Sequence, residues 1–164
     1  MSKVYHTSDW HIGHDGVCRF RPTFASDEEH NECILDNFND TITSKDTVYI
    51  HGDAIFHKRY IDIVKKLPGH KHLILGNHCL ENKKNRPTLL DLYQVFESIT
   101  SVVNKRGTWM THIPIHPDEL RGKYCIHGHM HYHVIDDDRY FNVCLEHTDW
   151  KPILREQLLE GRFD

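Results

Sequence analysis

Five short patches of chemically active side chains follow one another along the 164-residue chain, each at or just after a run of β-forming residues. The patches supply Asp, Asn and His, the residue types that hold hard and borderline divalent metal ions. Seven candidate ligands are too many for one tetrahedral ion. They suit two ions that share a bridging carboxylate, an arrangement that promotes in-line attack on phosphorus. The candidate ligands are Asp9, His11, Asp53, Asn77, His112, His129 and His131.

The first two patches are weak signals when each is taken alone. Asp9 and His11 are two residues apart at a strand end, so both side chains point to the same side and can reach one ion. The alternative is a turn aspartate beside a surface histidine. Asp53 follows a glycine, a common turn pair. Its functional interpretation is a carboxylate placed to bridge two ions.

The later patches are more specific. Asn77 offers a neutral carbonyl ligand, and His78 faces another way, toward a substrate rather than a metal. The alternative is an asparagine turn after a buried strand. His129 and His131 are two imidazoles separated by one residue after a glycine, which indicates metal binding. His112 is uninformative by itself.

The elements that must position these patches alternate between strand and helix early in the chain and run strand after strand later. This mixture predicts an α/β layered domain with mixed sheets and the patches on loops at one set of strand ends. Ser26 and Glu29 form a capping box that opens a helix. Further helices are expected over 60–67, 88–96 and 153–160, and strands over 4–8, 47–50, 71–75, 97–104, 108–112, 124–127 and 140–145.

Composition indicates one globular domain over residues 1–164, because 38% of the residues are hydrophobic and 27% charged. A net charge of −4 argues against a protein that grips duplex nucleic acid. No apolar run is long enough to cross a membrane, and the N-terminus has no apolar secretion segment. Five cysteines without a CxxC pair fit reduced thiols and a cytoplasmic location.

Taken together and in this order, the patches resemble the calcineurin-like metallophosphoesterase superfamily, whose pattern is D-x-H, G-D, G-N-H-[D/E], H and G-H-x-H. The resemblance spans residues 3–152 and is closest to small single-domain members from bacteria and phages. Those members often extend the first motif to a further histidine, here His14. The resemblance implies a four-layer αββα sandwich of two mixed β-sheets flanked by helices.

The resemblance also implies a set of ligands for each of two metal ions. Asp53 and a hydroxide would bridge the ions, with the hydroxide as the nucleophile. Mn²⁺ is the first choice, and Fe²⁺, Zn²⁺, Co²⁺ or Ni²⁺ also fit this donor set. One ion would be held by Asp9, His11, Asp53 and His131, and the other by Asp53, Asn77, His112 and His129.

Around the metals, the resemblance makes His78 the group that stabilises charge or protonates the leaving oxygen. His14 is a candidate for contacting the phosphate. Cys79 departs from the family, which has Asp or Glu there to support the histidine before it. We therefore expect a lower pKa or looser orientation for His78, which would slow esters with poor leaving groups most. No catalytic thiolate is expected at Cys79.

The function expected is a binuclear metal-dependent phosphoesterase, with phosphodiesters favoured over phosphomonoesters and small nucleotides or cyclic phosphates as first substrates. The alternative is a non-enzymatic scaffold that keeps the fold and binds a protein partner. A metal-responsive sensor ranks below both. Trp10 either stacks on a substrate base or packs on the sheet. The sequence does not indicate an oligomeric state.

Overall fold

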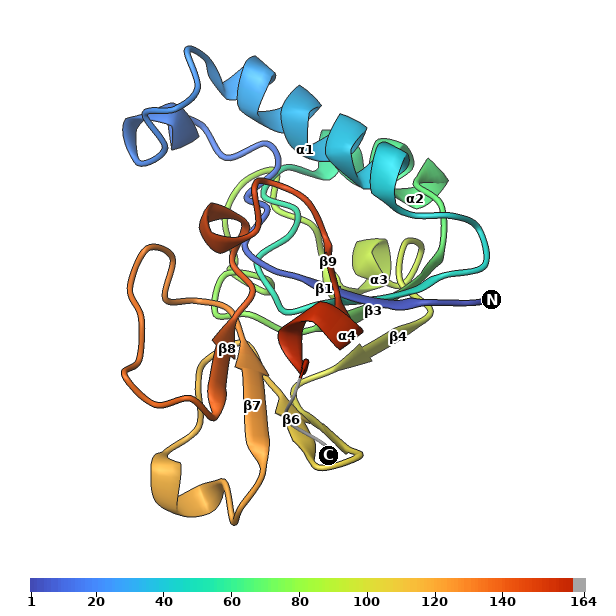
Figure 1. Cartoon of the computed structure of the whole chain (residues 1–164). Helices are drawn as coiled ribbons and strands as arrows, with labels where there is room; N and C mark the ends of the chain where they lie inside the picture. The colour runs from blue at the N-terminus through green and yellow to red at the C-terminus, as the bar shows by residue number, and fades with distance from the viewer. Residues whose placement is uncertain (161–164) are drawn as a thin grey trace.

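A computed structural model describes residues 1–160 and contains two mixed β-sheets. The strand order of the first sheet is β4-β3-β2-β1-β9. Strands β1, β2, β3 and β4 run parallel to one another, and β9 pairs antiparallel with β1. These strands are β1 (Val4–Thr7), β2 (Thr47–Ile50), β3 (His70–Ile74), β4 (Ser98–Thr100) and β9 (Ile153–Leu154) (Figure 1).

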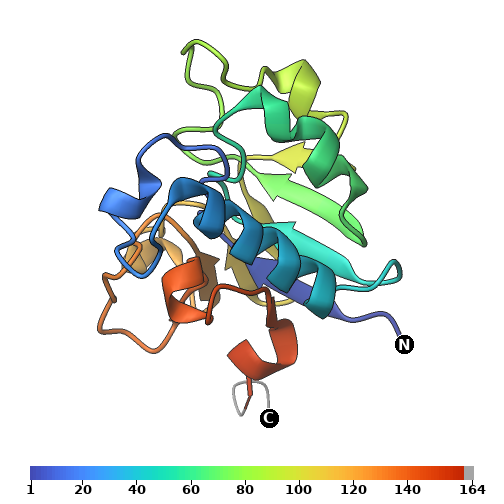
Figure 2. The ribbon, with the colours of Figure 1, turned by 90° about the horizontal axis from the view of Figure 1, so that it is seen from above.

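Three helices cover one face of the first sheet: α1 (Asp27–Thr41), α2 (Ile61–Lys66) and α3 (Leu89–Leu92) (Figure 2). Ser26 caps α1 by accepting a hydrogen bond from the backbone N–H of Glu29, as the capping box predicts. The apolar side chains of these helices and of the sheet form one buried core, which includes Ile34, Phe38, Val64, Val48 and Leu73. Burial of this core holds the helical layer on the sheet.

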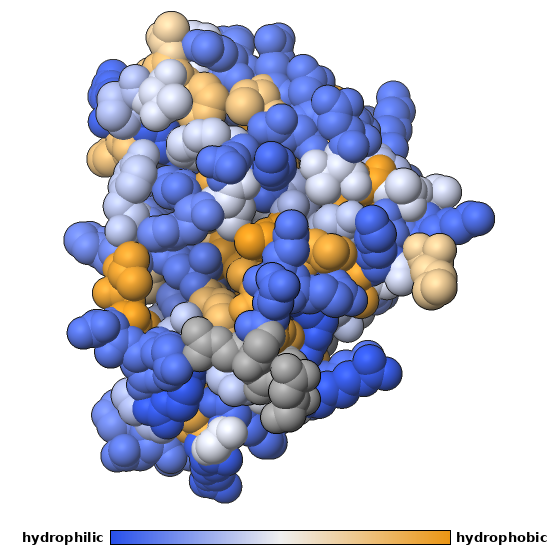
Figure 3. Space-filling model, in the orientation of Figure 1, coloured by the Kyte–Doolittle hydropathy of each residue, from blue (hydrophilic) through white to orange (hydrophobic). Residues whose placement is uncertain are grey.

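The second sheet packs against the other face of the first. Its order is β5-β6-β7-β8, with β6, β7 and β8 parallel and β5 antiparallel to β6. A smaller core of Ile74, Met110, Ile126 and Val143 joins the two sheets. The space-filling view shows an apolar area in the middle of a largely hydrophilic face, with smaller apolar areas toward its edges (Figure 3). The strands are β5 (Val103–Lys105), β6 (Thr108–Met110), β7 (Tyr124–His127) and β8 (Tyr140–Asn142).

A loop covers the outer face of the second sheet. Trp109 donates a hydrogen bond to the backbone oxygen of Leu120 (3.4 Å), and the Tyr140 hydroxyl donates to that of Ile115 (2.6 Å). This loop contains a short 3-10 turn, η3 (Pro117–Glu119). The predicted α/β sandwich of two mixed sheets is confirmed, with this segment as its fourth layer.

Several predicted elements are shorter in the structure, such as the helix expected over 88–96, which is Leu89–Leu92, and the strand expected over 140–145, which is Tyr140–Asn142. Two others differ in kind. The strand expected over 97–104 is two strands, because the chain leaves the first sheet after β4 and enters the second at β5. The segment 153–160 begins as β9 and becomes helical only in α4 (Arg155–Leu158), because Ile153 and Leu154 pair with the free edge of β1. Within residues 1–160, no helix is both long and apolar enough to span a membrane.

Candidate metal centre

The five patches meet because the strands that carry them end at the same side of the two sheets. Parallel pairing aligns the ends of β1, β2 and β3, and it aligns the ends of β6 and β7. Backbone hydrogen bonds then join the loops: Asp9 N–H donates to Gly52 (3.1 Å) and His11 N–H to Asp53 (2.9 Å). Gly128 N–H donates to His112 (2.9 Å). The loop after β1 is therefore joined to the loop after β2, and the loop after β6 to the loop after β7.

Five of the seven candidate ligands have left-handed backbone conformations. Their φ angles lie between 47° and 68°, a region in which Asp and His occur more often than most other residues. Such conformations cost roughly 1–3 kcal/mol each and concentrate at functional sites. The backbone thus turns these side chains out of the strands and toward a common point. The five are Asp9, His11, Asp53, His129 and His131.

Two glycines in the patches allow the ligand carboxylates to lie close to the backbone of neighbouring loops. A Cβ atom at Gly76 would collide with the carboxylate of Asp53, and one at Gly128 would collide with the side chains of Ser8 and Asp9. Any larger residue would push a ligand carboxylate out of place.

One cluster of ligand atoms consists of Asp9, His11 and His131. Oδ1 of Asp9 lies 3.5 Å from Nε2 of His11 and 3.7 Å from Nε2 of His131. Ligand atoms about 2.0–2.2 Å from a shared ion lie roughly 3–3.5 Å from one another. Nε2 of His11 is buried and has no hydrogen-bond partner within residues 1–160. The donor set therefore fits a divalent cation, which would satisfy that nitrogen.

A second cluster consists of Asp53, Asn77, His112 and His129. Nε2 of His112 lies 3.4 Å from Oδ2 of Asp53 and 2.8 Å from Oδ1 of Asn77. Nδ1 of His129 lies 3.0 Å from the same Asn77 oxygen. Ligand atoms of Asp9, Asp53 and His112 also lie within 4.8 Å of one another, so the two clusters adjoin.

Charges across these clusters shift the pKa values of Asp9 and His112. Burial acts to raise the pKa of Asp9, but contacts with His11 and His112 outweigh it and hold that pKa well below its usual range. Burial acts to lower the pKa of His112, and its contact with Asp53 reverses that effect. The aspartates are therefore ionised and available to a cation.

Groups around Asp9 direct one of its oxygens toward the cluster. Oδ2 accepts hydrogen bonds from the Ser8 hydroxyl, the Cys144 thiol (3.2 Å) and the backbone N–H of His129 (2.8 Å). Oδ1 is left to face His11 and His131.

His131 is oriented by a buried carboxylate that the sequence did not single out. Its Nδ1 lies 2.9 Å from Oε1 of Glu146, and this contact raises the pKa of His131. Arg21 donates to the same oxygen (2.9 Å) and to the backbone oxygens of Asp9 and Trp10. Such partners fix the ring so that its other nitrogen faces the metal. No local motif marks Glu146, because the contact depends on a fold that joins distant segments.

His78 also has a carboxylate partner, contrary to what Cys79 led us to expect. Nδ1 of His78 lies 2.9 Å from Oε1 of Glu81. The two groups form an ion-pair contact, but their geometry does not meet the angle of a hydrogen bond. The contact with His78 and the ammonium of Lys83 lower the pKa of Glu81 to about 2. Glu81 therefore supplies the charge that the family places at the residue after the histidine.

Cys79 serves the backbone of the site instead. Its sulfur accepts hydrogen bonds from the N–H groups of Gly76 (3.2 Å) and Asp53 (3.4 Å). Burial and the nearby Asp53 raise the pKa of the thiol to about 11. The group is protonated near neutral pH and is not a thiolate nucleophile.

A pocket of about 440 Å³ adjoins the first cluster. His14 lies in its wall with Nδ1 buried and without a hydrogen-bond partner in the described chain. Trp10 is 1% exposed and packs edge-on against Phe38, so it belongs to the core and not to this pocket. The other lining residues include Val17, Phe20, Phe56, His78, Lys83, Arg86 and Tyr132.

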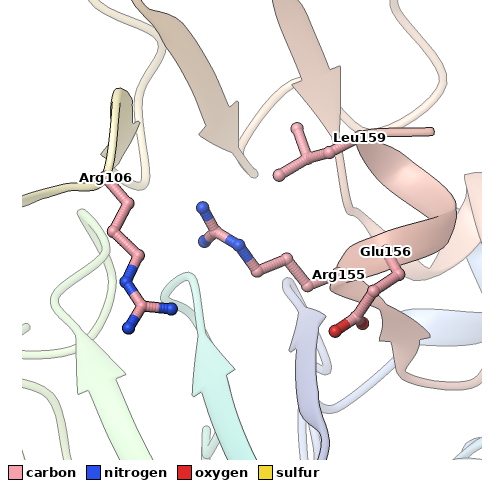
Figure 4. A pocket seen from close by; sticks show the side chains of 4 residues that line it. All are labelled: Arg106, Arg155, Glu156 and Leu159. Carbon is pink, nitrogen blue, oxygen red and sulfur yellow. The ribbon is translucent and has the colours of Figure 1, made fainter. Parts of the chain in front are cut away.

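A second hollow of about 350 Å³ lies away from the centre. Arg106 stands in the turn before β6 and Arg155 follows β9, at the opposite ends of the strands from the ligands. Figure 4 shows both guanidinium groups lining this hollow. It is separate from the metal clusters.

Comparison with known proteins decides the family. The model of the calcineurin-like phosphoesterases matches residues 2–161. The chain belongs to this family. Membership makes it a metal-dependent phosphoesterase, a hydrolase that works with divalent metal ions, and the two ligand clusters agree with this.

Among sequence relatives, the Gene 66 protein of Mycobacterium phage L5 is 30% identical over 80% of this chain and 78% of its own length. An uncharacterized protein of Methanocaldococcus jannaschii is 28% identical over 93% of this chain and 87% of its own length. A crystal structure of an Aquifex aeolicus protein of unknown function aligns with a TM-score of 0.73 at 25% identity, covering 96% of this chain and 98% of that one.

A nuclease from Pseudomonas putida also has this fold, with a TM-score of 0.54 at 17% identity over 78% of this chain and 61% of its own. At that identity, the likeness shows the fold alone.

Proposed function

We propose that this phosphoesterase is a binuclear phosphodiesterase acting on small nucleotide-type or cyclic phosphate diesters. The observation that carries the proposal is the pocket of about 440 Å³ beside the ligand clusters. Four apolar or aromatic side chains in its wall, Val17, Phe20, Phe56 and Tyr132, suit the organic groups of a diester better than a bare phosphate terminus. The five free cysteines favour a reducing compartment, so we place the protein in the cytoplasm.

We assign one ion to Asp9, His11, Asp53 and His131, and the other to Asp53, Asn77, His112 and His129, with Asp53 between them. Mn²⁺ is the proposed metal. When bound, two such ions supply an activated water as nucleophile and positive charge against the phosphate oxygens.

His78 is the proposed acid that protonates the leaving oxygen. Its ring lines the pocket, lies 6.3 Å from the ring of His11, and contacts the ionised Glu81. The contact with Glu81 orients the imidazole toward the pocket, where a general acid must reach the leaving oxygen. His14 is positioned to orient the phosphate, because its buried Nδ1 is available to an oxygen of the substrate.

The nucleotide part of the proposal rests on two exposed aromatic side chains. Phe20 and Tyr132 line the pocket and are 70% and 55% exposed. Nucleobases stack on such rings and gain roughly 1–3 kcal/mol per base. A nucleoside substituent would therefore bind more tightly than a methyl group at the same phosphorus.

Three p-nitrophenyl esters test this proposal, because they share one leaving group. We expect kcat/KM to rank thymidine 5′-(p-nitrophenyl phosphate) above methyl p-nitrophenyl phosphate, and both above p-nitrophenyl phosphate. Phe20→Ala should remove much of the nucleoside advantage, whereas Leu90→Ala, at a residue 78% exposed and away from the pocket, should not. Faster turnover of the monoester than of either diester would overturn the proposal.

A further inference from the structure

Three cationic side chains line a groove that extends from the metal centre. Lys83 and Arg86 border both the pocket of about 440 Å³ and an adjoining hollow of about 260 Å³, and Lys84 borders the second hollow. His14 and Phe56 also line both, so the two hollows form one continuous groove. Its basic part lies on the loop that follows His78.

Arg86 is built into the wall of this groove. Its side chain is 9% exposed, and its guanidinium carbon lies 3.6 Å from the centre of the Phe56 ring. Nη2 lies 3.0 Å from Oε2 of Glu81. Nη1 is buried and has no hydrogen-bond partner among residues 1–160. A buried N–H without an acceptor is unfavourable, so this donor is prepared for an acceptor from outside the chain.

The local charge favours an anion as that acceptor. Lys83 and Arg86 share a single carboxylate, Glu81, at 3.0 Å each. With Lys84, and with Asp15 also bordering the second hollow, positive charge is in excess here although the chain carries −4 overall. An arginine fork recognises phosphate particularly well.

We propose that this groove is a second phosphate subsite, and that the substrate is a nucleotidyl diester with a further phosphate next to the one that is cleaved. Arg86 is the principal contact, and Lys83 and Lys84 add charge. The Phe56 ring lies 4.3 Å from the ring of His11 and 3.6 Å from the Arg86 guanidinium. One ring therefore separates the metal centre from the subsite, a spacing that neighbouring phosphates of one molecule can bridge. This inference rests on the proposed function.

The test compares thymidine 5′-(p-nitrophenyl phosphate) with the same ester carrying a 3′-phosphate, using the Mn²⁺-loaded protein. We expect the 3′-phosphate to raise kcat/KM about tenfold, the effect of one charge-assisted contact. Arg86→Met keeps an apolar stem over Phe56 and should abolish this gain, which is measured as the ratio of kcat/KM on the two esters within each variant, so that a change common to both esters cancels. Arg59→Met is the matched control, since Arg59 stacks on Tyr60 (5.0 Å) but does not line the groove.

A p-nitrophenyl ester of thymidine 5′-diphosphate distinguishes the source of the second phosphate. A gain with the 3′-phosphate supports a nucleic-acid-type substrate, and a gain with the diphosphate supports the same subsite used by a nucleoside diphosphate. If neither phosphate raises kcat/KM in the wild-type protein, the subsite is refuted.

Binding separates this inference from the proposed function. Calorimetry on the Mn²⁺-loaded protein should show thymidine 3′,5′-bisphosphate binding about tenfold more tightly than thymidine 5′-phosphate, and Arg86→Met should remove the difference. This result would support the subsite even if no diester were hydrolysed. Equal affinities would overturn the subsite while leaving the phosphodiesterase proposal in place.

Discussion

Nδ1 of His78 lies 2.9 Å from Oε1 of Glu81, three residues farther along the chain. The family has its acidic residue directly after this histidine, where this chain has Cys79. In this chain the carboxylate that contacts the histidine is therefore at position 81 and not at position 79. The charge beside the imidazole is retained, and the position next to Asp53 is occupied by an uncharged thiol.

Replacing Glu81 with glutamine should therefore slow substrates with poor leaving groups. General acid catalysis contributes about 10²–10⁴-fold, so we expect a loss of about tenfold or more for an alkyl diester and a small change for a nitrophenyl diester. Steady-state kinetics on both substrates measure this difference. Glu119→Gln, which breaks the exposed pair between Glu119 and Arg121, is the matched control. Equal losses on the two substrates would show that Glu81 does not act through the leaving group.

Restoring the family residue with Cys79→Asp should give no gain in rate. The new carboxylate would stand near Asp53, because the Cys79 sulfur lies 3.8 Å from Oδ1 of that residue. Like charges repel at this separation, and Glu81 already supports His78. We expect kcat on an alkyl diester to stay level or fall. A tenfold rise would mean that Glu81 fails to replace the missing acid.

Glu146→Gln should weaken metal binding. The carboxylate fixes the ring of His131, and loss of such a partner typically lowers metal affinity about 10–100-fold. Titration of the stripped protein with Mn²⁺, followed by calorimetry, measures the change. Glu156→Gln serves as a control, because Glu156 borders the hollow at the opposite ends of the strands from the ligands. Unchanged metal affinity would show that Glu146 does not orient His131 for metal binding.

Stability of the metal-free protein should fall in mild acid. Burial lowers the pKa of His30 and of His51 to about 4, below the unfolded value of 6.5. The unfolded chain therefore binds protons first, and stability that is complete above pH 6.5 is lost as the pH falls toward 4. Between pH 6.5 and 5 we expect a loss of about 2 kcal/mol per histidine.

Urea unfolding in the presence of a chelator measures this loss. His51→Gln keeps a neutral hydrogen-bonding group and should reduce the dependence on pH. A free energy of unfolding that stays constant from pH 7 to pH 5 would contradict the expectation.

Much of the fold and the position of the candidate ligands could be predicted, because both depend on local patterns. Strand 47–50 has the predicted bounds, and Ser26 caps the N-terminus of the predicted helix. Asp9, Asn77 and His129 come together because parallel strands end at one side of the sheets. Each patch lies within a few residues of a strand end, so the position of its candidate ligands can be predicted from the local sequence.

The contacts that support the site could not be predicted, because they join distant segments. Arg21 and Glu146 are 125 residues apart and meet only in the folded chain. The strand expected over 97–104 had a continuous β-forming pattern, and nothing in that pattern shows that its two halves belong to different sheets. Glu81 is only three residues from His78, but no known motif has an acidic residue at that spacing from the histidine.

The most direct test of the binuclear centre is hydrolysis of bis-p-nitrophenyl phosphate by metal-stripped protein, with Mn²⁺ added back, for the wild type and Asp53→Asn. The amide has the shape of the carboxylate and can still accept the backbone N–H of His78, so the fold should be kept. We predict turnover that depends on Mn²⁺ and falls about 10²–10³-fold in the variant, the loss expected when one group that stabilises the transition state is removed. Wild-type rates in Asp53→Asn, or full activity without metal, would contradict the account. Two bound ions with no turnover of any diester would favour a non-enzymatic scaffold instead.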